Sequence, residues 1–333
     1  MTEARGSIFL FHGEDNYSVS KKTNFWIKEF KNKHGGDINI DIIEAKSLNT
    51  KEFGTNLQAV PFLGEKRLVI VKNYLKKGKA DEQKKVAELI QKTPDHCILV
   101  FTEIEPPDKR LTLYKRLTKI AKVEEFKPLS PAQLTQWIIT QARERNGNID
   151  NTTANFLSTH VGPNLWQLSS EIDKLIHAAI STPDKRITRE LIEQLVKASL
   201  SSSIFKLTDA IAARNKTLSL NVFKVLIDSG EDLMMVFYMI VRHFRILAQA
   251  QYLTERGERP DSIAKILKQH PFVAQTASRQ SRNFTAEKIR DIYAALLEID
   301  RSFKTGRIRI TTENQTELLL EIEKLIIQTC SKN

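Results

Sequence analysis

Nucleotide chemistry would be found just after the first predicted strand, Ile8 to Phe11. In a parallel sheet, a glycine at this point can open a phosphate-binding loop of the pattern G-x-x-x-x-G-K-[ST], in which backbone amides and one lysine hold the phosphates. Here Gly13 is followed by Glu14 and Asp15, and no second glycine precedes Lys21. Two carboxylates at this position would repel phosphate. We therefore expect this chain neither to bind nor to hydrolyse ATP.

The sequence also lacks the combinations of residues that other kinds of catalytic site require. An acidic residue that holds Mg²⁺ should follow a central strand, yet Lys72-Asn73 follows the apolar run that ends at Val71. Glu103 and Glu105 follow another apolar run, and without a phosphate loop we expect them to be solvated loop charges. The histidines lack the paired spacing of metal ligands, and His243 in an apolar helix is expected to be a satisfied core residue. We predict no catalytic residue, metal or cofactor.

The chain is basic, with a formal net charge of +11 and a pI near 9.5, which favours an acidic partner. The better candidate surface for DNA or for an acidic partner is a run spaced along a helix end and loop: Arg301, Lys304, Arg307 and Arg309. The alternative interpretation, a solvated helix face, stays open. Few aromatic residues are interleaved with the basic ones, so stacking on single-stranded nucleic acid is not indicated.

A short helix is predicted just before a buried strand. Phe53, Leu57 and Val60 have the spacing of one apolar helix face, and Pro61 should end the helix because it lacks an N–H donor. The unbroken apolar run over 68–71 is typical of a strand buried on both faces of a parallel sheet. The segment between them must therefore form a helix-to-strand turn.

Two large apolar residues, Phe62 and Leu63, lie in this turn, just before Gly64. Turns usually face solvent, so two large apolar side chains are unexpected there. In one interpretation they fold back on the core as a plug. In the other they form an exposed hydrophobic wedge that enters a pocket on a partner protein, the kind of anchor that dominates interface energetics. The residues alone leave both interpretations open.

Strands and helices alternate up to Pro128, and only helices are predicted after it. The expected fold is a doubly wound α/β domain with a five-stranded parallel sheet, followed by all-α domains. The predicted division is an α/β domain at 1–128, a small helical domain at 129–200 and a larger helical domain at 201–333. The five predicted strands are Ile8–Phe11, an alternating edge strand through Ile38, Ile40 and Ile42, then Leu68–Val71, Cys97–Phe101 and Val123–Phe126.

Cysteine content and the length of apolar runs indicate the cellular compartment of the protein. Cys97 and Cys330 are the only cysteines, so a disulfide framework or a cysteine-based zinc site is not expected, and a reducing cytosol fits. The longest apolar run, Leu233 to Val241, is shorter than the roughly 20 residues of a membrane span. We expect a cytoplasmic protein that has no membrane partner.

Six segments, in order along the chain, together resemble the delta-subunit family of the bacterial DNA polymerase III clamp loader. They are FLFHGEDNY at 9–17, AVPFLGEKRLVIVKN at 59–73, DKRLTLYKRL at 108–117, FKPLSPAQLTQWI at 126–138, SSIFKLTDAIAARN at 202–215 and HPFVAQTASRQSRNF at 270–284. The resemblance implies an AAA+-like α/β module with a helical lid, followed by a helical collar domain. It also implies a subunit that does not hydrolyse ATP, as the missing phosphate loop indicates independently.

The resemblance assigns a role to the turn. The family's clamp-contacting pair is a hydrophobic dipeptide there, commonly Leu-Phe or Phe-Phe, and it falls on Phe62 and Leu63, in the order Phe-Leu. The implied mechanism is mechanical: the pair docks into the ring-shaped sliding clamp (the beta subunit) and favours its opened form. The implied further partners are the gamma/tau and delta prime subunits, which join through the collar, and primed DNA within the complex.

The implied assembly is part of the DNA polymerase III holoenzyme, a DNA-directed DNA polymerase and hence a nucleotidyltransferase, although no catalytic site is expected in this chain. The rival hypothesis, suggested by the net charge of +11, is a nucleic-acid-binding helical protein or a degenerate helicase-like AAA+ protein. Tight binding of the isolated chain to DNA, with a steep salt dependence, would favour the rival.

Overall fold

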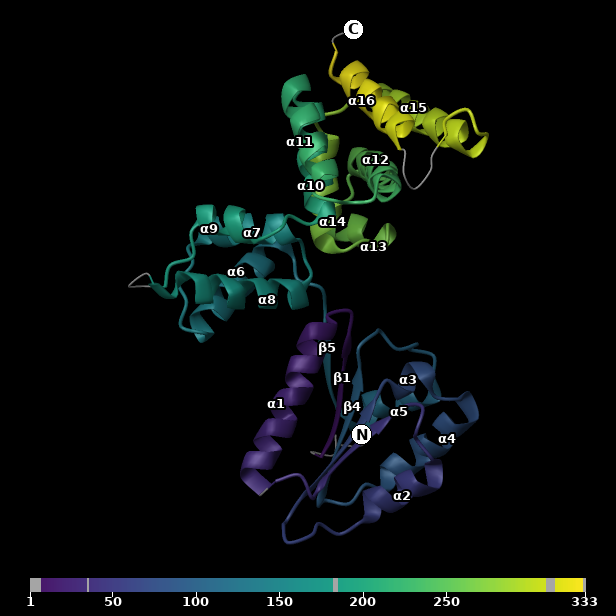
Figure 1. The fold of residues 1–333 in the computed structure, drawn as a ribbon. Helices are drawn as coiled ribbons and strands as arrows, with labels where there is room; N and C mark the ends of the chain where they lie inside the picture. The colour runs from purple at the N-terminus through teal and green to yellow at the C-terminus, as the bar shows by residue number, and fades with distance from the viewer. Residues whose placement is uncertain (1–6, 35, 182–184, 310–314, 332–333) are drawn as a thin grey trace. The chain divides into compact units, whose positions relative to one another are not determined.

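The structure is a computed structural model that describes residues 7–34, 36–181, 185–309 and 315–331. The chain forms two compact units, Met1–Pro128 and Leu129–Asn333 (Figure 1). The first unit carries the sheet and the second consists of helices. Each unit is described by itself below.

The first unit is built on a five-stranded parallel sheet with the order β2-β3-β4-β1-β5. Strand β1 lies between β4 and β5, and its residue Phe9 is opposite Val100 on one side and Lys122 on the other. The five predicted strands are confirmed, with β2 at one edge, but β2 begins at Ile40 and does not include Ile38, which was predicted to belong to it. The strands are β1 (Ile8–Gly13), β2 (Ile40–Glu44), β3 (Arg67–Lys72), β4 (Cys97–Glu103) and β5 (Lys122–Phe126).

Helices cover both faces of the sheet, which confirms the predicted α/β class. Helix α1 (Asn16–His34) packs on one face, over Leu68, Ile70 and other buried residues. Alternate residues of the same strand, Val69 and Val71, point to the other face. That face is covered, as Figure 1 shows, by α2 (Thr50–Gln58), α3 (Tyr74–Lys77), α4 (Ala80–Leu89) and α5 (Thr112–Ile120). A 3₁₀ turn, Ile90–Lys92, follows α4.

The second unit begins with four helices and a 3₁₀ turn, Ala179–Ser181. Its first helix starts at Ser130 in a capping box with Gln133, and Pro131, which suits the first turn of a helix, follows directly. Side-chain caps also precede the next three helices. These helices are α6 (Pro131–Glu144), α7 (Asn151–Val161), α8 (Leu165–Ala178) and α9 (Arg189–Leu195).

Among the described residues, seven further helices follow in the second unit, beginning where Ser199 caps the first of them. Their largest buried cluster lies wholly between Ile204 and Cys330, so this part has its own hydrophobic core. The division of the second unit at residue 200 stays a prediction. The helices are α10 (Leu200–Ala212), α11 (Lys216–Asp228), α12 (Leu233–Glu255), α13 (Pro260–Ile266), α14 (Pro271–Ser281), α15 (Ala286–Lys304) and α16 (Thr316–Cys330).

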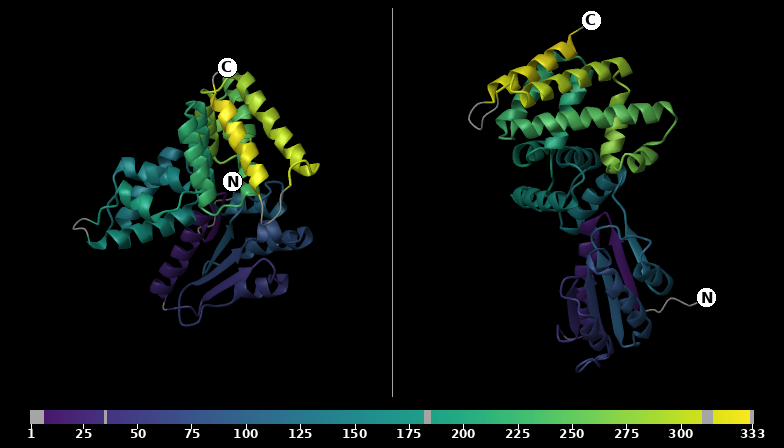
Figure 2. Two further views of the ribbon diagram at one scale, coloured as in Figure 1. Left: turned by 45° about the horizontal axis from the view of Figure 1, so that its top comes forward. Right: turned by 90° about the vertical axis from the view of Figure 1, so that its right-hand side faces the viewer.

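Helix α12 is the centre of this core, and the right-hand view in Figure 2 shows it in green among its neighbours. By length and composition it is the one described helix that could cross a membrane, but its buried residues pack into the core cluster. His243 on this helix is 4% exposed, and its Nε2 lies 2.8 Å from Oε1 of Gln280. The prediction of a satisfied core histidine is confirmed, and burial lowers the pKa of His243 to about 4.

Candidate functional site

The carboxyl edge of the sheet, where a nucleotide would bind, is filled by the protein's own groups. Gly13 lies so close to β5 that an added Cβ would stand 1.9 Å from the carbonyl oxygen of Phe126. Oδ1 of Asp15 accepts a hydrogen bond from the Ser18 N–H at 2.9 Å, so a carboxylate satisfies the helix N-terminus that would otherwise bind a phosphate. His12, which precedes Gly13, is 2% exposed, and burial lowers its pKa.

The prediction that Glu103 is a solvated loop charge is wrong, because this residue is 1% exposed. Its Oε1 accepts the backbone N–H of Leu75 at 2.7 Å and thereby caps the short helix α3. Burial raises the pKa of Glu103 to about 7, although hydrogen bonds from backbone N–H groups of α3 act in the opposite direction. Glu105 is exposed as predicted, and it forms an ion pair with Lys76.

We predict that Glu103→Gln removes a pH dependence of stability. A carboxyl group whose pKa is higher in the folded state stabilises the fold at pH values below its unfolded pKa and loses this contribution as the pH rises through about 7. The free energy of unfolding of the wild type, relative to Glu103→Gln, should therefore fall by about 2 kcal/mol between pH 5 and pH 8. Denaturant unfolding at both pH values checks this. A constant difference would show that Glu103 titrates normally.

At the opposite, N-terminal edge of the sheet, α2 leads into the turn. Phe53 and Leu57 are each 1% exposed and anchor the helix, but Val60 is 79% exposed. Its predicted place on the buried helix face is therefore wrong. The helix ends at Gln58, and the extended backbone of Ala59, two residues before Pro61, turns the chain away from the core.

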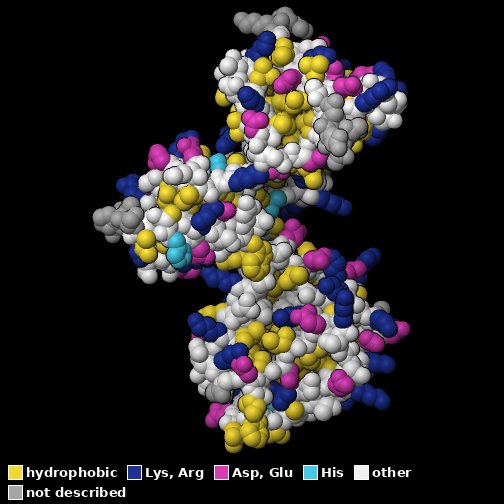
Figure 3. Space-filling model, viewed as in Figure 1, with side chains coloured by type: hydrophobic (Ala, Val, Ile, Leu, Met, Phe, Trp, Pro, Cys, Tyr) yellow, Lys and Arg dark blue, Asp and Glu magenta, His cyan; other side chains and the backbone are white. Residues whose placement is uncertain are grey.

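Phe62 and Leu63 are 58% and 92% exposed, which is the opposite of what the plug interpretation predicts. Ile38 is 64% exposed, because β2 begins only at Ile40 and leaves it outside the predicted edge strand. Figure 3 shows hydrophobic side chains at the foot of the α/β unit, where this edge lies. We call Ile38, Val60, Phe62 and Leu63 the apolar tip. Sequence analysis did not include Ile38 or Val60 in the candidate surface.

The centre of the turn is held by the side chain of Asn39, which is 1% exposed. Its Oδ1 accepts the N–H of Phe62 at 2.7 Å, and its Nδ2 donates to the carbonyl oxygen of Phe62 at 2.9 Å. The backbone carbonyl of Asn39 also accepts the N–H of Leu68 at the start of β3. We call the two side-chain bonds the Asn39 clasp. No local sequence pattern predicts it, because its partners are 23 residues apart.

The two ends of the turn are tied to the segment before β4. Nε2 of His96 lies 3.1 Å from the carbonyl oxygen of Ala59, and Nε2 of Gln58 donates to the carbonyl oxygen of Lys92 at 2.8 Å. On the strand side, Nζ of Lys66 donates to the carbonyl oxygen of Asp95 at 2.9 Å. The apolar tip is therefore presented by a backbone that is fixed at both ends and in the middle.

Leu63 has a φ of 48°, in the left-handed region that L-residues with large side chains rarely adopt. This conformation costs about 1 to 2 kcal/mol relative to a right-handed one. The tethers of the turn offset that cost, and the result is a leucine side chain that is almost fully exposed. Such strained residues gather at ligand-binding sites, where the strain is part of the mechanism.

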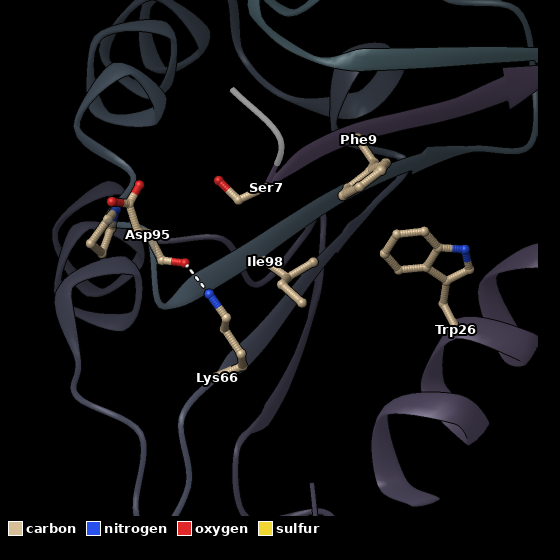
Figure 4. Close-up of a pocket in the computed structure, with 7 residues that line it drawn as sticks. Ser7, Phe9, Trp26, Lys66, Asp95 and Ile98 are labelled. Atoms are coloured by element: carbon tan, nitrogen blue, oxygen red, sulfur yellow. Dashed lines mark hydrogen bonds between the residues drawn. The ribbon is translucent and has the colours of Figure 1, made fainter. Parts of the chain in front are cut away.

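A cavity of about 810 Å³ opens beside the turn, between α1 and the sheet (Figure 4). Trp26 of α1 points toward the strands, and Phe9 and Ile98 of the sheet form much of the wall. Of the described residues that line it, Lys66 and Asp95 are the ionisable ones, and Nζ of Lys66 donates to the backbone carbonyl oxygen of Asp95. Among the described residues, no group of three or more His, Cys, Asp or Glu side chains is placed to hold a metal ion.

The basic run at the end of α15 is partly neutralised by acidic neighbours. Nζ of Lys304 lies 2.8 Å from Oδ2 of Asp300, and Arg307 lies 2.7 Å from Glu298. Arg301 also approaches Glu298, at 4.0 Å. The fourth residue, Arg309, is exposed, and its backbone N–H donates to Oε2 of Glu317. The structure thus brings all four predicted residues to one helix end, but with acids among them.

Comparison with known families shows which family the chain belongs to. Residues 9–127 match the family model for the DNA polymerase III delta subunit, and residues 201–321 match the model for the C-terminal domain of that subunit. The chain belongs to this family. It is 28% identical to the DNA polymerase III subunit delta of Bacillus subtilis, over 98% of this chain and 93% of that protein.

A second delta-family relative and a solved structure agree. The probable DNA polymerase III subunit delta of Aquifex aeolicus is 22% identical over 75% of this chain and 72% of that protein. The structure of the Bacillus subtilis DNA clamp loader delta protein matches with a TM-score of 0.72 and 26% identity, covering 98% of this chain and 96% of that one. The predicted family and fold class are therefore confirmed along the chain.

Proposed function

We propose that this delta-family chain binds the sliding clamp through Phe62 and Leu63 and opens the ring for loading onto primed DNA, without hydrolysing ATP itself. The observation that carries the proposal is the exposure of the pair, 58% and 92%, on a turn held at both ends and in the middle. Exposed apolar anchors on a rigid frame suit a preformed hydrophobic pocket. Ring opening then follows if the chain binds the opened clamp more tightly than the closed one.

Binding of the purified chain to the isolated sliding clamp, without nucleotide, tests this proposal directly. We expect a stable complex in a pull-down or by surface plasmon resonance, at moderate salt and with no other subunit present. The rival, nucleic-acid-binding hypothesis predicts no clamp complex and tight, salt-dependent binding to DNA instead. The acids beside the basic run of α15 lead us to expect weak DNA binding by the isolated chain.

The isolated protein should not bind ATP at millimolar concentration. Glu14 and Asp15 stand where phosphate would lie, and Asp15 already satisfies the N-terminal turn of α1. The close approach of Gly13 to Phe126 occupies the space beside them. Isothermal titration calorimetry with Mg²⁺ and ATP should give no binding heat. Micromolar, Mg²⁺-dependent binding would contradict this prediction.

The remaining parts of the proposal concern the assembly. Residues 129–200 serve as the lid, and residues 201–333 serve as the collar that joins the gamma/tau and delta prime subunits. In the assembled complex, Arg301, Lys304, Arg307 and Arg309 contact DNA or a partner, and the complex works in the cytoplasm as part of the polymerase holoenzyme. Membership of the delta family and the separate core of residues 204–330 support this assignment.

A further inference from the structure

Asn39 connects the two loops that form the apolar tip. It follows Ile38 directly in the chain, and both groups of its side-chain amide bond to the backbone of Phe62, at 2.7 Å and 2.9 Å. At 1% exposure its side chain is out of reach of any partner that docks on the tip. Asn39 can therefore affect binding only through the conformation of the turn.

The close fit around the clasp shows how specifically the turn is shaped. A Cβ added to Gly64 would lie 3.3 Å from Nδ2 of Asn39, which is tighter than ordinary contact. Leu63, between the clasped residue and this glycine, has the left-handed φ of 48°. A free chain would rarely populate that conformation at leucine. The clasp holds the residue before Leu63 and so limits the alternatives that the turn can adopt.

We propose that Asn39 is a positioning residue for clamp binding, which sets Phe62 and Leu63 in their docking orientation before the clamp arrives. This inference rests on the proposed binding of the clamp through these two residues. A turn that is already ordered binds more tightly, because less conformational freedom is lost on association. If only a fraction of molecules has the competent turn, the apparent Kd rises by the inverse of that fraction.

The test is the clamp affinity of Asn39→Ala in the full chain. Two hydrogen bonds of ordinary net strength correspond to a loss of about tenfold in affinity. The loss should appear in the association rate, because fewer molecules are competent, while the dissociation rate stays within about twofold. Amide hydrogen exchange at Phe62, whose N–H the clasp holds, should become faster in the free variant.

Gln83→Ala is the matched control, because Gln83 is a buried amide of the same unit that holds a different segment. Its Nε2 donates to the backbone carbonyl oxygens of Tyr74, Leu75 and Gly78, which follow the opposite end of β3. Its clamp affinity should stay within about twofold of the wild type. A second background separates positioning from general damage. In the double variant Phe62→Ala with Leu63→Ala, where both positioned side chains are absent, Asn39→Ala should cause little further loss of affinity. A further loss as large as that in the wild type would overturn the positioning role.

The outcomes distinguish this inference from the proposed function. Faster exchange at Phe62 with unchanged clamp affinity would overturn the role of Asn39 and leave clamp binding through the pair intact. Unchanged affinity of the double variant Phe62→Ala with Leu63→Ala would overturn the proposed function, and this inference with it. If Asn39→Ala does not fold, Asn39→Asp keeps the acceptor for the Phe62 N–H and loses the donor. That variant should bind more weakly than the wild type, and wild-type affinity would overturn the inference.

Discussion

Replacing Phe62 and Leu63 together by alanine should abolish most clamp binding while the protein stays folded. Anchors of this kind cost about 2 to 4 kcal/mol each when truncated, and about 1.4 kcal/mol is a tenfold change in affinity. Even with partial additivity, the double variant should lose on the order of a hundredfold or more in affinity. The melting temperature should change little, because the two side chains are 58% and 92% exposed and contribute little to the core.

Phe25→Ala is the matched control for this double variant. Phe25 lies on α1 and is 57% exposed, almost the same as Phe62, but it is not part of the apolar tip. Its replacement should leave clamp affinity unchanged, so a general effect of removing surface aromatic area is excluded. Wild-type affinity of the double variant, measured by surface plasmon resonance, would move the binding site elsewhere. A large fall in melting temperature would instead show that the pair supports the fold.

The parallel sheet could be predicted because its signals are local. Unbroken apolar runs such as 68–71 indicated strands buried on both faces, and the structure places them at the centre of the sheet. Helix starts with side-chain caps, such as Ser130 and Thr285, also depend on residues that are close in the sequence. In each case a few neighbouring residues carry enough of the energy to determine the local structure.

Features that depend on distant partners could not be predicted. Helix α3 has only the residues Tyr74–Lys77, too few for a periodic signal, and it depends on Glu103, 28 residues further along the chain. The burial of Glu103 was missed for the same reason, because a carboxylate after a strand gives no sign of the N–H groups that it will meet. Such groups become visible only when the fold brings the segments together.

The candidate site also combines features that have a local sequence signal with features that depend on distant partners. Sequence alone located Phe62 and Leu63 in a turn but left a buried plug and an exposed wedge equally open. The exposure follows from the backbone, which is tied by Asn39 from one loop and by residues 92–96 from another. Ile38 and Val60 were missed because spacing assigned one to a strand and the other to a helix. Both elements stop short of these residues, at Ile40 and Gln58.

The helical part at 201–333 should be sufficient and necessary for joining the other clamp-loader subunits. Its core cluster lies wholly within residues 204–330, so we expect it to fold without the rest of the chain. It also leaves large apolar side chains exposed, more than a protein that works alone needs. They lie on five of its described helices: Leu218 and Val225 on α11, Met235, Tyr238 and Tyr252 on α12, Ile266 on α13, Tyr293 and Leu297 on α15, and Leu320 on α16.

A chain of residues 201–333 should therefore co-purify with the gamma/tau and delta prime subunits, whereas a chain of residues 1–200 should not. In the full chain, Leu297→Glu with Leu320→Glu should weaken assembly by on the order of a hundredfold, because each carboxylate would be buried unpaired in an apolar interface. Both leucines are exposed, at 54% and 48%, on the contacting helices α15 and α16, so folding should survive. Ile180→Glu, at a 65% exposed position outside this part, is the control and should assemble normally. Analytical gel filtration of the reconstituted complex measures the assembly of the two shortened chains, the double variant and the control variant. Assembly of residues 1–200 as complete as that of the full chain would show that the collar assignment is wrong.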